Sequence, residues 1–270
     1  MVEIVDIAPG LWIWRMEHPG WKPGDDWQPV VTCTCVESGG EVLLLDPLWP
    51  PDHAAEVWSR FDRRRPTAAV VIKPDHVRDI DRFVERFQIP AFGPRVFFPD
   101  DVPRTTLEPV RAGYDLPGGV VAQYDGRDGT ETPLWFPLQR TVVFADALTE
   151  RDGRLRVWSS LWHEQHALPA LRELLALPFE RVIISHGAPV HDRAAFERAL
   201  ELPPWPCSPL HIAAWAGSLT MVRKLVDGGA DLNARDEERH ATPLEWAKNA
   251  KREAVVAYLE KIAGGVRPGI

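Results

Sequence analysis

A 34-residue unit that occurs twice near the C-terminal end constrains the fold of this chain more than any other feature. Residues 34 positions apart match repeatedly, as in Ser208 and Thr242, Leu210 and Leu244, Ala213 and Ala247, Val222 and Val256, and Leu225 and Leu259. A unit of this length is one supersecondary element, which buries its apolar face against a neighbouring copy. The C-terminal quarter is therefore predicted to be a stack of helical repeats.

Each copy carries signals for the start and the end of its helices. Ser208 and Thr242 each precede a proline, so that a hydroxyl N-cap satisfies free amides and the proline presets φ at the first helical position. A second helix is predicted at 221–226, where apolar residues recur at helical spacing, and it ends at Gly228-Gly229, where glycine supplies a left-handed C-cap. The second copy repeats this pattern at 254–259, before Gly264.

The segments 208–214 and 228–236 closely resemble the ankyrin repeat, and the resemblance covers about residues 207–264. There are two departures: one extra residue lies in 236–240, and Lys251 stands where the first copy has Gly217. The resemblance implies a helical pair that binds a protein partner, although the pair can equally be a packed structural appendage. About three repeats are usually needed for independent stability, so two are expected to pack on a preceding helix at 194–200 and on the first domain.

The residues before the repeats are predicted to form a separate α/β domain. We place the domain at 1–201, a stiff and extended Pro-rich linker at 202–206, and the two repeats at 207–266. Apolar runs bounded by turn residues predict strands at 11–14, 30–36, 42–45, 68–72, 142–145 and 181–185. Helical patterns lie at 53–61, 77–87 and 168–177, and Gly39-Gly40 predicts a hairpin turn. Layers of helices on buried sheets follow from this order.

Polar residues follow four of the predicted strands, where α/β folds place their sites. These residues are Asp46, Asp75-His76, Asp146 and His186. The order of the elements resembles the metallo-β-lactamase superfamily over residues 5–191, which implies an αββα sandwich. The family's signature is Thr-His-x-His-x-Asp-His after an apolar strand, followed by a His after Gly, a bridging Asp after a strand and a final His before Gly.

Only half of the family's two-metal site is present. Aligning Asp75-His76 with the closing Asp-His of the signature places Val71 and Lys73 at the first two histidines, and the third histidine falls at Arg127. In the family these three histidines hold the first metal. The ligands of the second metal are all present, as Asp75, His76, Asp146 and His186.

Two interpretations of this half site remain open. Two carboxylates and two imidazoles suit one Zn or Fe ion, which would make the protein a hydrolase with Asp75 and Asp146 as catalytic carboxylates. Lys73 and Arg127 would then bind a small anionic ester-type substrate. Alternatively, Lys73 and Arg127 neutralise the two carboxylates and disfavour a divalent cation, so that the domain holds no metal. The second interpretation predicts a non-catalytic protein-interaction module.

Composition excludes several other functions. The net charge of -8 argues against nucleic acid or an anionic membrane surface as a partner. The N-terminus carries no cationic start followed by an apolar stretch, so we expect a cytoplasmic protein. Cys33 and Cys35 are predicted to share one face of a strand. Among the 12 tryptophans, Trp21 and Trp27 lie in a Pro/Gly/Asp-rich loop and are candidates for stacking on a ligand.

Overall fold

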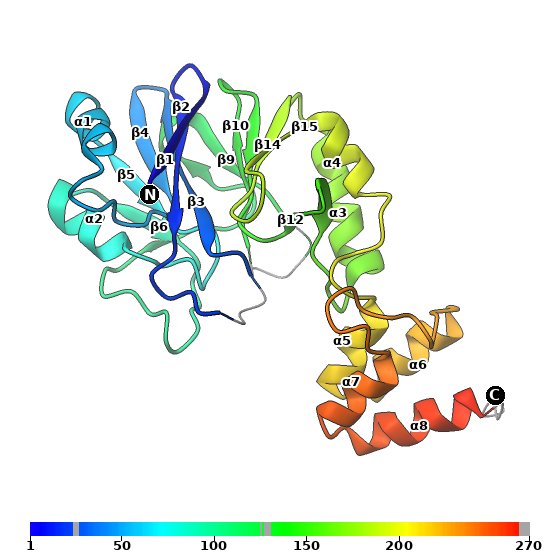
Figure 1. Ribbon diagram of the computed structural model, residues 1–270. Coiled ribbons are helices and arrows are strands. Elements are labelled where there is room, and N and C mark those ends of the chain that lie inside the picture. The colour runs from blue at the N-terminus through cyan, green and yellow to red at the C-terminus, as the bar shows by residue number, and fades with distance from the viewer. Residues whose placement is uncertain (24–26, 125, 127–130, 265–270) are drawn as a thin grey trace.

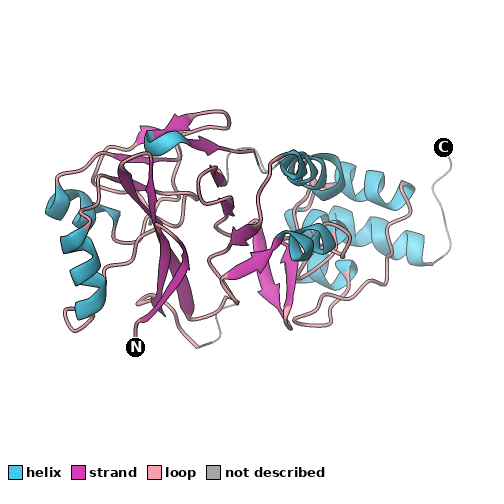
Figure 2. Cartoon of the chain, turned by 90° about the horizontal axis from the view of Figure 1, so that it is seen from above, coloured by secondary structure: helices cyan, strands magenta, loops and turns pink. Residues whose placement is uncertain are grey.

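The computed structural model describes residues 1–23, 27–124, 126 and 131–264. The first part of the chain forms a sandwich of two sheets with helices on both outer faces, and the C-terminal helices form a smaller unit beside it (Figures 1 and 2). This arrangement confirms the predicted αββα sandwich with an all-α repeat pair.

The first sheet begins as an antiparallel meander and continues with parallel strands. Within the described residues its order is β1-β2-β3-β4-β5-β6-β7. The bounds are β1 Glu3–Ala8, β2 Leu11–Glu17, β3 Val30–Ser38, β4 Glu41–Leu45, β5 Ala68–Val70, β6 Ala91–Gly93 and β7 Glu108–Pro109. Gly39 and Gly40 both have positive φ in the hairpin between β3 and β4, as the sequence predicted.

The second sheet has a parallel pair at its centre. In the part of the chain that the structure describes, its order is β15-β14-β11-β10-β9-β8, with β11 parallel to β14. The bounds are β8 Asp115–Leu116, β9 Val120–Ala122, β10 Leu134–Phe136, β11 Thr141–Val143, β14 Arg181–Ile183 and β15 Val190–Asp192. A separate hairpin is formed by β12 (Leu148–Arg151) and β13 (Arg154–Val157).

Three apolar clusters hold these layers together. Helices α1 (Ala55–Arg63) and α2 (Ile80–Phe87) bury Phe61 and Phe83 against Trp14 on the outer face of the first sheet. Cys33 and Cys35 lie in the same cluster, which confirms that they share one face of β3. A second cluster fills the space between the sheets, and a third lies under α3 (Leu168–Glu173) and α4 (Arg193–Ala199).

Three central strands are shorter than their apolar runs predicted. β5 ends at Val70, β11 at Val143 and β14 at Ile183, although each apolar run continues for two residues. These extra residues lie outside the sheets but are still buried. Their backbone N–H groups bond to loop side chains, as Ile72 does to Asp46 and Ala145 to Glu131. These extensions bring the polar residues that follow them to one edge of the sandwich.

The two repeats form the predicted helix pairs. The helices are α5 (Pro209–Ala216), α6 (Leu219–Asp227), α7 (Pro243–Asn249) and α8 (Glu253–Ala263). Ser208 and Thr242 each form a capping box at the start of their helices. Gly217 ends α5 with a φ of 75°, and Lys251 adopts a φ of 55° at the matching position of the second copy. The lysine therefore takes a backbone conformation that glycine adopts without strain.

The linker is packed against the first domain along its length. Trp205 is buried, its backbone N–H donates to the carbonyl of Val157, and its ring lies 5.0 Å from that of Trp158. Arg156 is also buried and donates to the carbonyl of Pro203 and to Glu237. The repeats therefore lean on the first domain through the linker and through Leu161, which packs on their apolar core. The expected support, the helix at 194–200, instead places its apolar side chains in the core of the sandwich.

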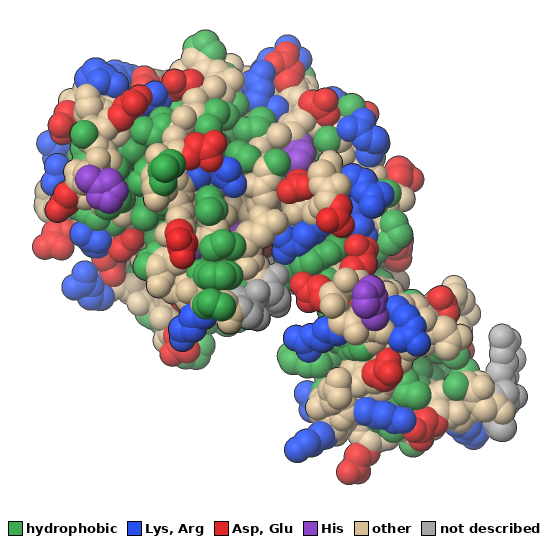
Figure 3. All heavy atoms as spheres, in the orientation of Figure 1, with side chains coloured by type: hydrophobic (Ala, Val, Ile, Leu, Met, Phe, Trp, Pro, Cys, Tyr) green, Lys and Arg blue, Asp and Glu red, His purple; other side chains and the backbone are tan. Residues whose placement is uncertain are grey.

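The described residues contain no helix long and apolar enough to cross a membrane. On the face shown in Figure 3, acidic and basic side chains are interspersed over both units of the molecule.

Candidate functional site

The polar residues that follow β4, β5, β11 and β14 meet beside a pocket of about 370 Å³. The pocket lies at the edge where these strands end, which is the position that the sequence predicted. It is lined by His18, Trp27, Val31, Lys73, Asp75, His76, Arg78, Asp101, Asp146, Trp158 and His186.

Lys73 joins two of the predicted site carboxylates. Its Nζ atom lies 2.5 Å from Oδ2 of Asp75 and 2.7 Å from Oδ2 of Asp146. Burial opposes the charge on this amine, but the carboxylates of Asp146 and Asp75 raise the pKa of Lys73 above its usual value. The ammonium is therefore charged at neutral pH, and it neutralises part of the acidic cluster.

His76 lies between two carboxylates and is buried. Its Nδ1 atom is 2.8 Å from Oδ2 of Asp46, and its Nε2 atom is 3.3 Å from Oδ2 of Asp146. Burial lowers the pKa of His76, whereas the charges of Asp146 and Asp46 raise it, and the net result is about 9. Without a metal, this imidazole carries a proton at neutral pH.

Asp146 is held in place by a second buried carboxylate, that of Glu131. The oxygens of Glu131 accept the backbone N–H groups of Ala145, Asp146 and Ala147 at 2.8 to 2.9 Å. These bonds fix the turn after β11 and point the Asp146 side chain at the cluster. Burial opposes its charge, but His76 and Lys73 keep the pKa of Asp146 well below its usual value.

His186 reaches the same carboxylate from the end of β14, the strand that lies parallel to β11 in the second sheet. Its Nε2 atom lies 3.4 Å from Oδ1 of Asp146, and an isolated bridge between Val31 and His186 ties its backbone to β3. Burial lowers the pKa of His186 to about 4, so the ring is neutral at pH 7. Within the described residues its Nδ1 atom has no hydrogen-bond partner. The Trp27 ring packs edge-on against it at 5.6 Å.

Asp46 and Arg78 form the frame behind these side chains. Asp46 has a φ of 44°, and its Oδ1 atom accepts the backbone N–H of Ile72 at 2.7 Å. Arg78 donates to the carbonyls of Asp46 and Thr32 at 2.6 and 3.0 Å. These bonds connect the loops after β4 and β5 to β3, so His76 is held by groups from several elements.

The ligand atoms of His76, Asp146 and His186 lie within 4.8 Å of one another, a spacing at which the described residues can hold a metal ion. Two imidazoles and one carboxylate are a suitable donor set for Zn²⁺ or Fe²⁺. Asp75, which the sequence added to this set, is outside the group, and its carboxylate pairs with Lys73. Arg127, the other predicted substrate-binding residue, lies outside the described residues.

Other residues of the pocket carry no motif. Asp101, Arg78 and Trp158 come from loops or strand ends with no family signature, and Glu131, which lies behind Asp146, has none either. Only Asp46, which follows an apolar strand, and Trp27, which lies in a polar loop, had a signal in the sequence. Trp27 lines this pocket, and the stacking of Trp21 or Trp27 on a ligand stays a prediction.

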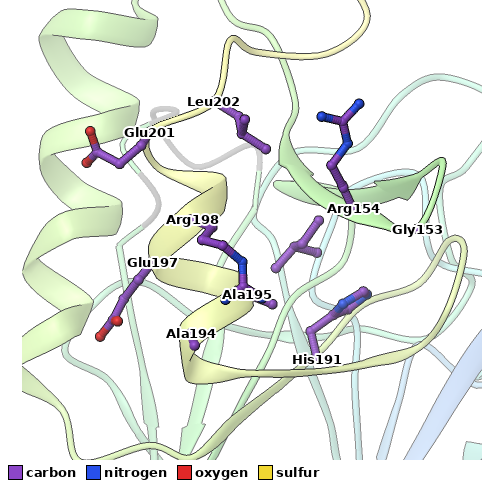
Figure 4. Close-up of a pocket in the computed structure, with 10 residues that line it drawn as sticks. Gly153, Arg154, His191, Ala194, Ala195, Glu197, Arg198, Glu201 and Leu202 are labelled. Atoms are coloured by element: carbon purple, nitrogen blue, oxygen red, sulfur yellow. The ribbon is translucent and has the colours of Figure 1, made fainter.

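A larger pocket of about 580 Å³ lies away from this cluster, between α4 and the β12–β13 hairpin (Figure 4). Leu155, Ala195 and Leu202 contribute its apolar surface. Its two glutamates form ion pairs, Glu197 with Arg193 and Glu201 with Arg172. It contains none of the site residues that the sequence predicted.

Comparison with solved structures identifies the fold. A metallo-β-lactamase from Pontibacter korlensis covers 75% of this chain and 98% of its own, with a TM-score of 0.54 and 16% identity. A metallo-β-lactamase of Pseudomonas aeruginosa in its mono-zinc form covers 74% and 95%, with a TM-score of 0.56 and 18% identity. The match to a metallo-β-lactamase from Hirschia baltica covers 74% of this chain and 96% of the other, with a TM-score of 0.54 and 17% identity. The sandwich has the metallo-β-lactamase fold.

The C-terminal unit is identified independently. Residues 200–247 match the family model described as ankyrin repeats (many copies). No curated protein matches the sequence. The chain therefore combines a metallo-β-lactamase fold with ankyrin repeats, and its site retains a group of residues that can bind a metal.

Proposed function

We propose that this protein is a non-catalytic, metal-independent interaction protein, in which Lys73 takes the place of a metal ion in a metallo-β-lactamase fold. The observation that carries the proposal is the position of the Lys73 ammonium, 2.7 Å from Asp146 and 2.5 Å from Asp75. One positive charge thereby binds Asp146, which belongs to the group that can hold a metal, and Asp75, which the sequence analysis added to that group.

Electrostatics favours the ammonium over a divalent ion. A metal ion at Asp146 would lie close to Lys73 and to a protonated His76, both of which would repel it. Metal ligation also requires neutral imidazole, so binding would have to release the proton that His76 holds with a pKa of about 9. Both costs lower the affinity of the site for metal at neutral pH.

The ankyrin repeats supply the interaction surface in this proposal. Trp215 on α5 is 56% exposed, and its large apolar ring is a suitable anchor for a protein partner. The helix pair is held against the sandwich by the linker, so the sandwich acts as the support that two repeats require. The partner would therefore be a protein that contacts the first repeat.

The second candidate is a single-metal hydrolase acting on an anionic ester-type substrate. The group of His76, Asp146 and His186 favours it, as does the fold shared with a Pseudomonas aeruginosa enzyme that was solved in a mono-zinc form. A zinc or iron ion held by these three residues would supply a Lewis acid and an activated water. In this candidate Asp75 would hold Lys73 beside the substrate.

Elemental analysis of untagged protein, grown with added zinc and iron, distinguishes the two candidates. We expect metal near zero in the native chain and about one metal per chain after Lys73→Met, which removes the competing charge. Lys248→Met, at an exposed lysine of α7, is the control and leaves the metal content unchanged. A native chain that holds one metal, and loses it in His186→Ala, would overturn the proposal in favour of the hydrolase.

A second experiment restores the family's missing ligands. Histidines placed at Val71, Lys73 and Arg127 complete the first-metal site that the alignment implies, so metal content is expected to rise. An unchanged metal content in a folded triple variant would contradict the alignment from which the half site was inferred.

A further inference from the structure

The pocket beside Lys73 contains a carboxylate that is not neutralised. Asp101 lines the pocket, and among the described residues its side chain has no hydrogen-bond or ion-pair partner. Burial and the nearby charges of Asp75 and Asp100 raise the pKa of Asp101, and the smaller effects of His76 and Lys73 lower it. Lys73 forms no ion pair with Asp101, and its ammonium is bonded to Asp75 and Asp146 instead.

Other acceptor atoms of the pocket also lack donors. The Nε2 atom of His186 lies 3.4 Å from Oδ1 of Asp146, and the residue is 9% exposed. Its Nδ1 atom and the Oδ1 atom of Asp75 are buried without a partner in the part of the chain that the structure describes. A buried acceptor without a donor costs free energy, so the pocket is suited to a ligand that brings N–H groups.

Two indole rings contribute to the walls of the same pocket. Trp27 is partly buried and is held by ring contacts to His18 and His186 at 5.2 and 5.6 Å. Trp158 lies on the side of the linker, with its ring 5.0 Å from that of Trp205. Indole faces attract cations, and they do so most strongly where water is partly excluded.

We propose that this pocket binds a cationic nitrogen group, an alkylammonium or a guanidinium, between Asp101, Trp27 and Trp158. The inference rests on the proposed metal-free site, because a divalent ion at Asp146 would repel such a ligand strongly. The charges of Lys73 and His76 are offset by their ion pairs with Asp75, Asp146 and Asp46. It also revises the expected substrate-binding role of Lys73, since an ammonium that holds two carboxylates does not select an anion. A free amine and a basic side chain of a protein partner share this chemistry.

Isothermal titration of the full chain with n-butylammonium chloride tests the proposal, and sodium butyrate is the control of opposite charge. We expect saturable binding of the ammonium and none of the butyrate. Asp101→Asn is expected to weaken binding about tenfold, since it removes a charged partner, and Trp27→Ala about fivefold. Asp100→Asn makes the same change at an exposed neighbour outside the pocket and is expected to leave binding within twofold.

A blocked lysine tripeptide and its N-acetyl-lysine counterpart distinguish the two sources of the cation. Tighter binding of the lysine peptide than of butylammonium assigns the pocket to a protein side chain, and the reverse order assigns it to a small amine. Absence of saturable ammonium binding, or equal losses in Asp101→Asn and Asp100→Asn, overturns the inference. Metal analysis of the same samples separates this failure from a failure of the proposed function, which would appear as bound metal.

Discussion

The Nδ1 atom of His76 lies 2.8 Å from Oδ2 of Asp46, while Oδ1 of the same carboxylate accepts the backbone N–H of Ile72 at 2.7 Å. One side chain therefore fixes both the loop that carries His76 and the direction of the His76 ring. Because a carboxylate at this distance stabilises imidazolium, the protonation of His76 is linked to the folding of the site.

We predict that Asp46→Asn lowers the pKa of His76 from about 9 toward its ordinary value of 6.5. Because the folded pKa is raised, the protonated ring stabilises the fold below pH 6.5, and this contribution is lost as the pH rises toward 9. NMR titration of the histidine ring in metal-free protein measures the pKa. Urea unfolding between pH 6.5 and 9 measures the stability, whose decline should flatten in His76→Gln. An unchanged pKa of His76 in Asp46→Asn would refute the coupling between Asp46 and His76.

Lys251→Gly is predicted to stabilise the repeats. Lys251 has a φ of 55°, a left-handed conformation that costs a residue with a Cβ atom about 1 kcal/mol more than glycine. The free energy of unfolding, followed by the fluorescence of Trp246, should rise by about that amount. Lys248→Gly is the control, because glycine inside α7 should lower stability by about 1 kcal/mol. A lower free energy of unfolding in both variants would count against backbone strain at Lys251.

Arg156→Ala is predicted to loosen the linker from the sandwich. Arg156 is buried and donates to the Pro203 carbonyl and to Glu237, so its loss removes contacts between the two units and costs roughly 1–3 kcal/mol. A glutamate-specific endoproteinase should cleave the Glu201–Leu202 bond, directly before the linker, several times faster in this variant. Arg154→Ala, at an exposed position of the same strand, is the control. Equal cleavage rates in the two variants would show that Arg156 does not hold the linker.

Glu131→Ala is predicted to destabilise the fold by about 3 kcal/mol or more, because it leaves buried backbone N–H groups around Asp146 without an acceptor. Glu131→Gln keeps one side-chain oxygen and should cost less. Urea unfolding of both variants, beside Glu180→Gln at an exposed ion pair, measures the difference. A cost for Glu131→Ala as small as that for Glu180→Gln would contradict this role.

An isolated fragment of residues 202–270 is predicted not to fold cooperatively. Leu161 of the sandwich packs on the apolar core of the repeats, and two repeats bury too little surface by themselves. Circular dichroism of the fragment should show a broad thermal transition where the full chain shows a sharp one. A sharp transition in the fragment would mean that the repeats need no support.

The repeat helices were predictable because their signals are local. A hydroxyl N-cap, a proline at the first helical position and apolar residues at helical spacing act within a few residues, and their return after 34 positions shows that the helices stack. The apolar runs likewise predicted the strands, and the ends of those runs predicted which loops carry polar residues. Asp46, His76, Asp146 and His186 do meet at one edge for this reason.

Only the tertiary structure decided what those side chains do. Asp75 and His76 are adjacent in the sequence, yet Asp75 bonds to Lys73 while His76 turns to Asp46 and Asp146. The direction of these two side chains depends on the path of the loop after β5 and on partners that follow other strands. No local residue pattern encodes that path or those partners. Asp101 and Trp158 come to the pocket from separate segments for the same reason. The sequence determined that Asp46, His76, Asp146 and His186 gather at this edge, and three-dimensional packing determined that a lysine binds the carboxylates there.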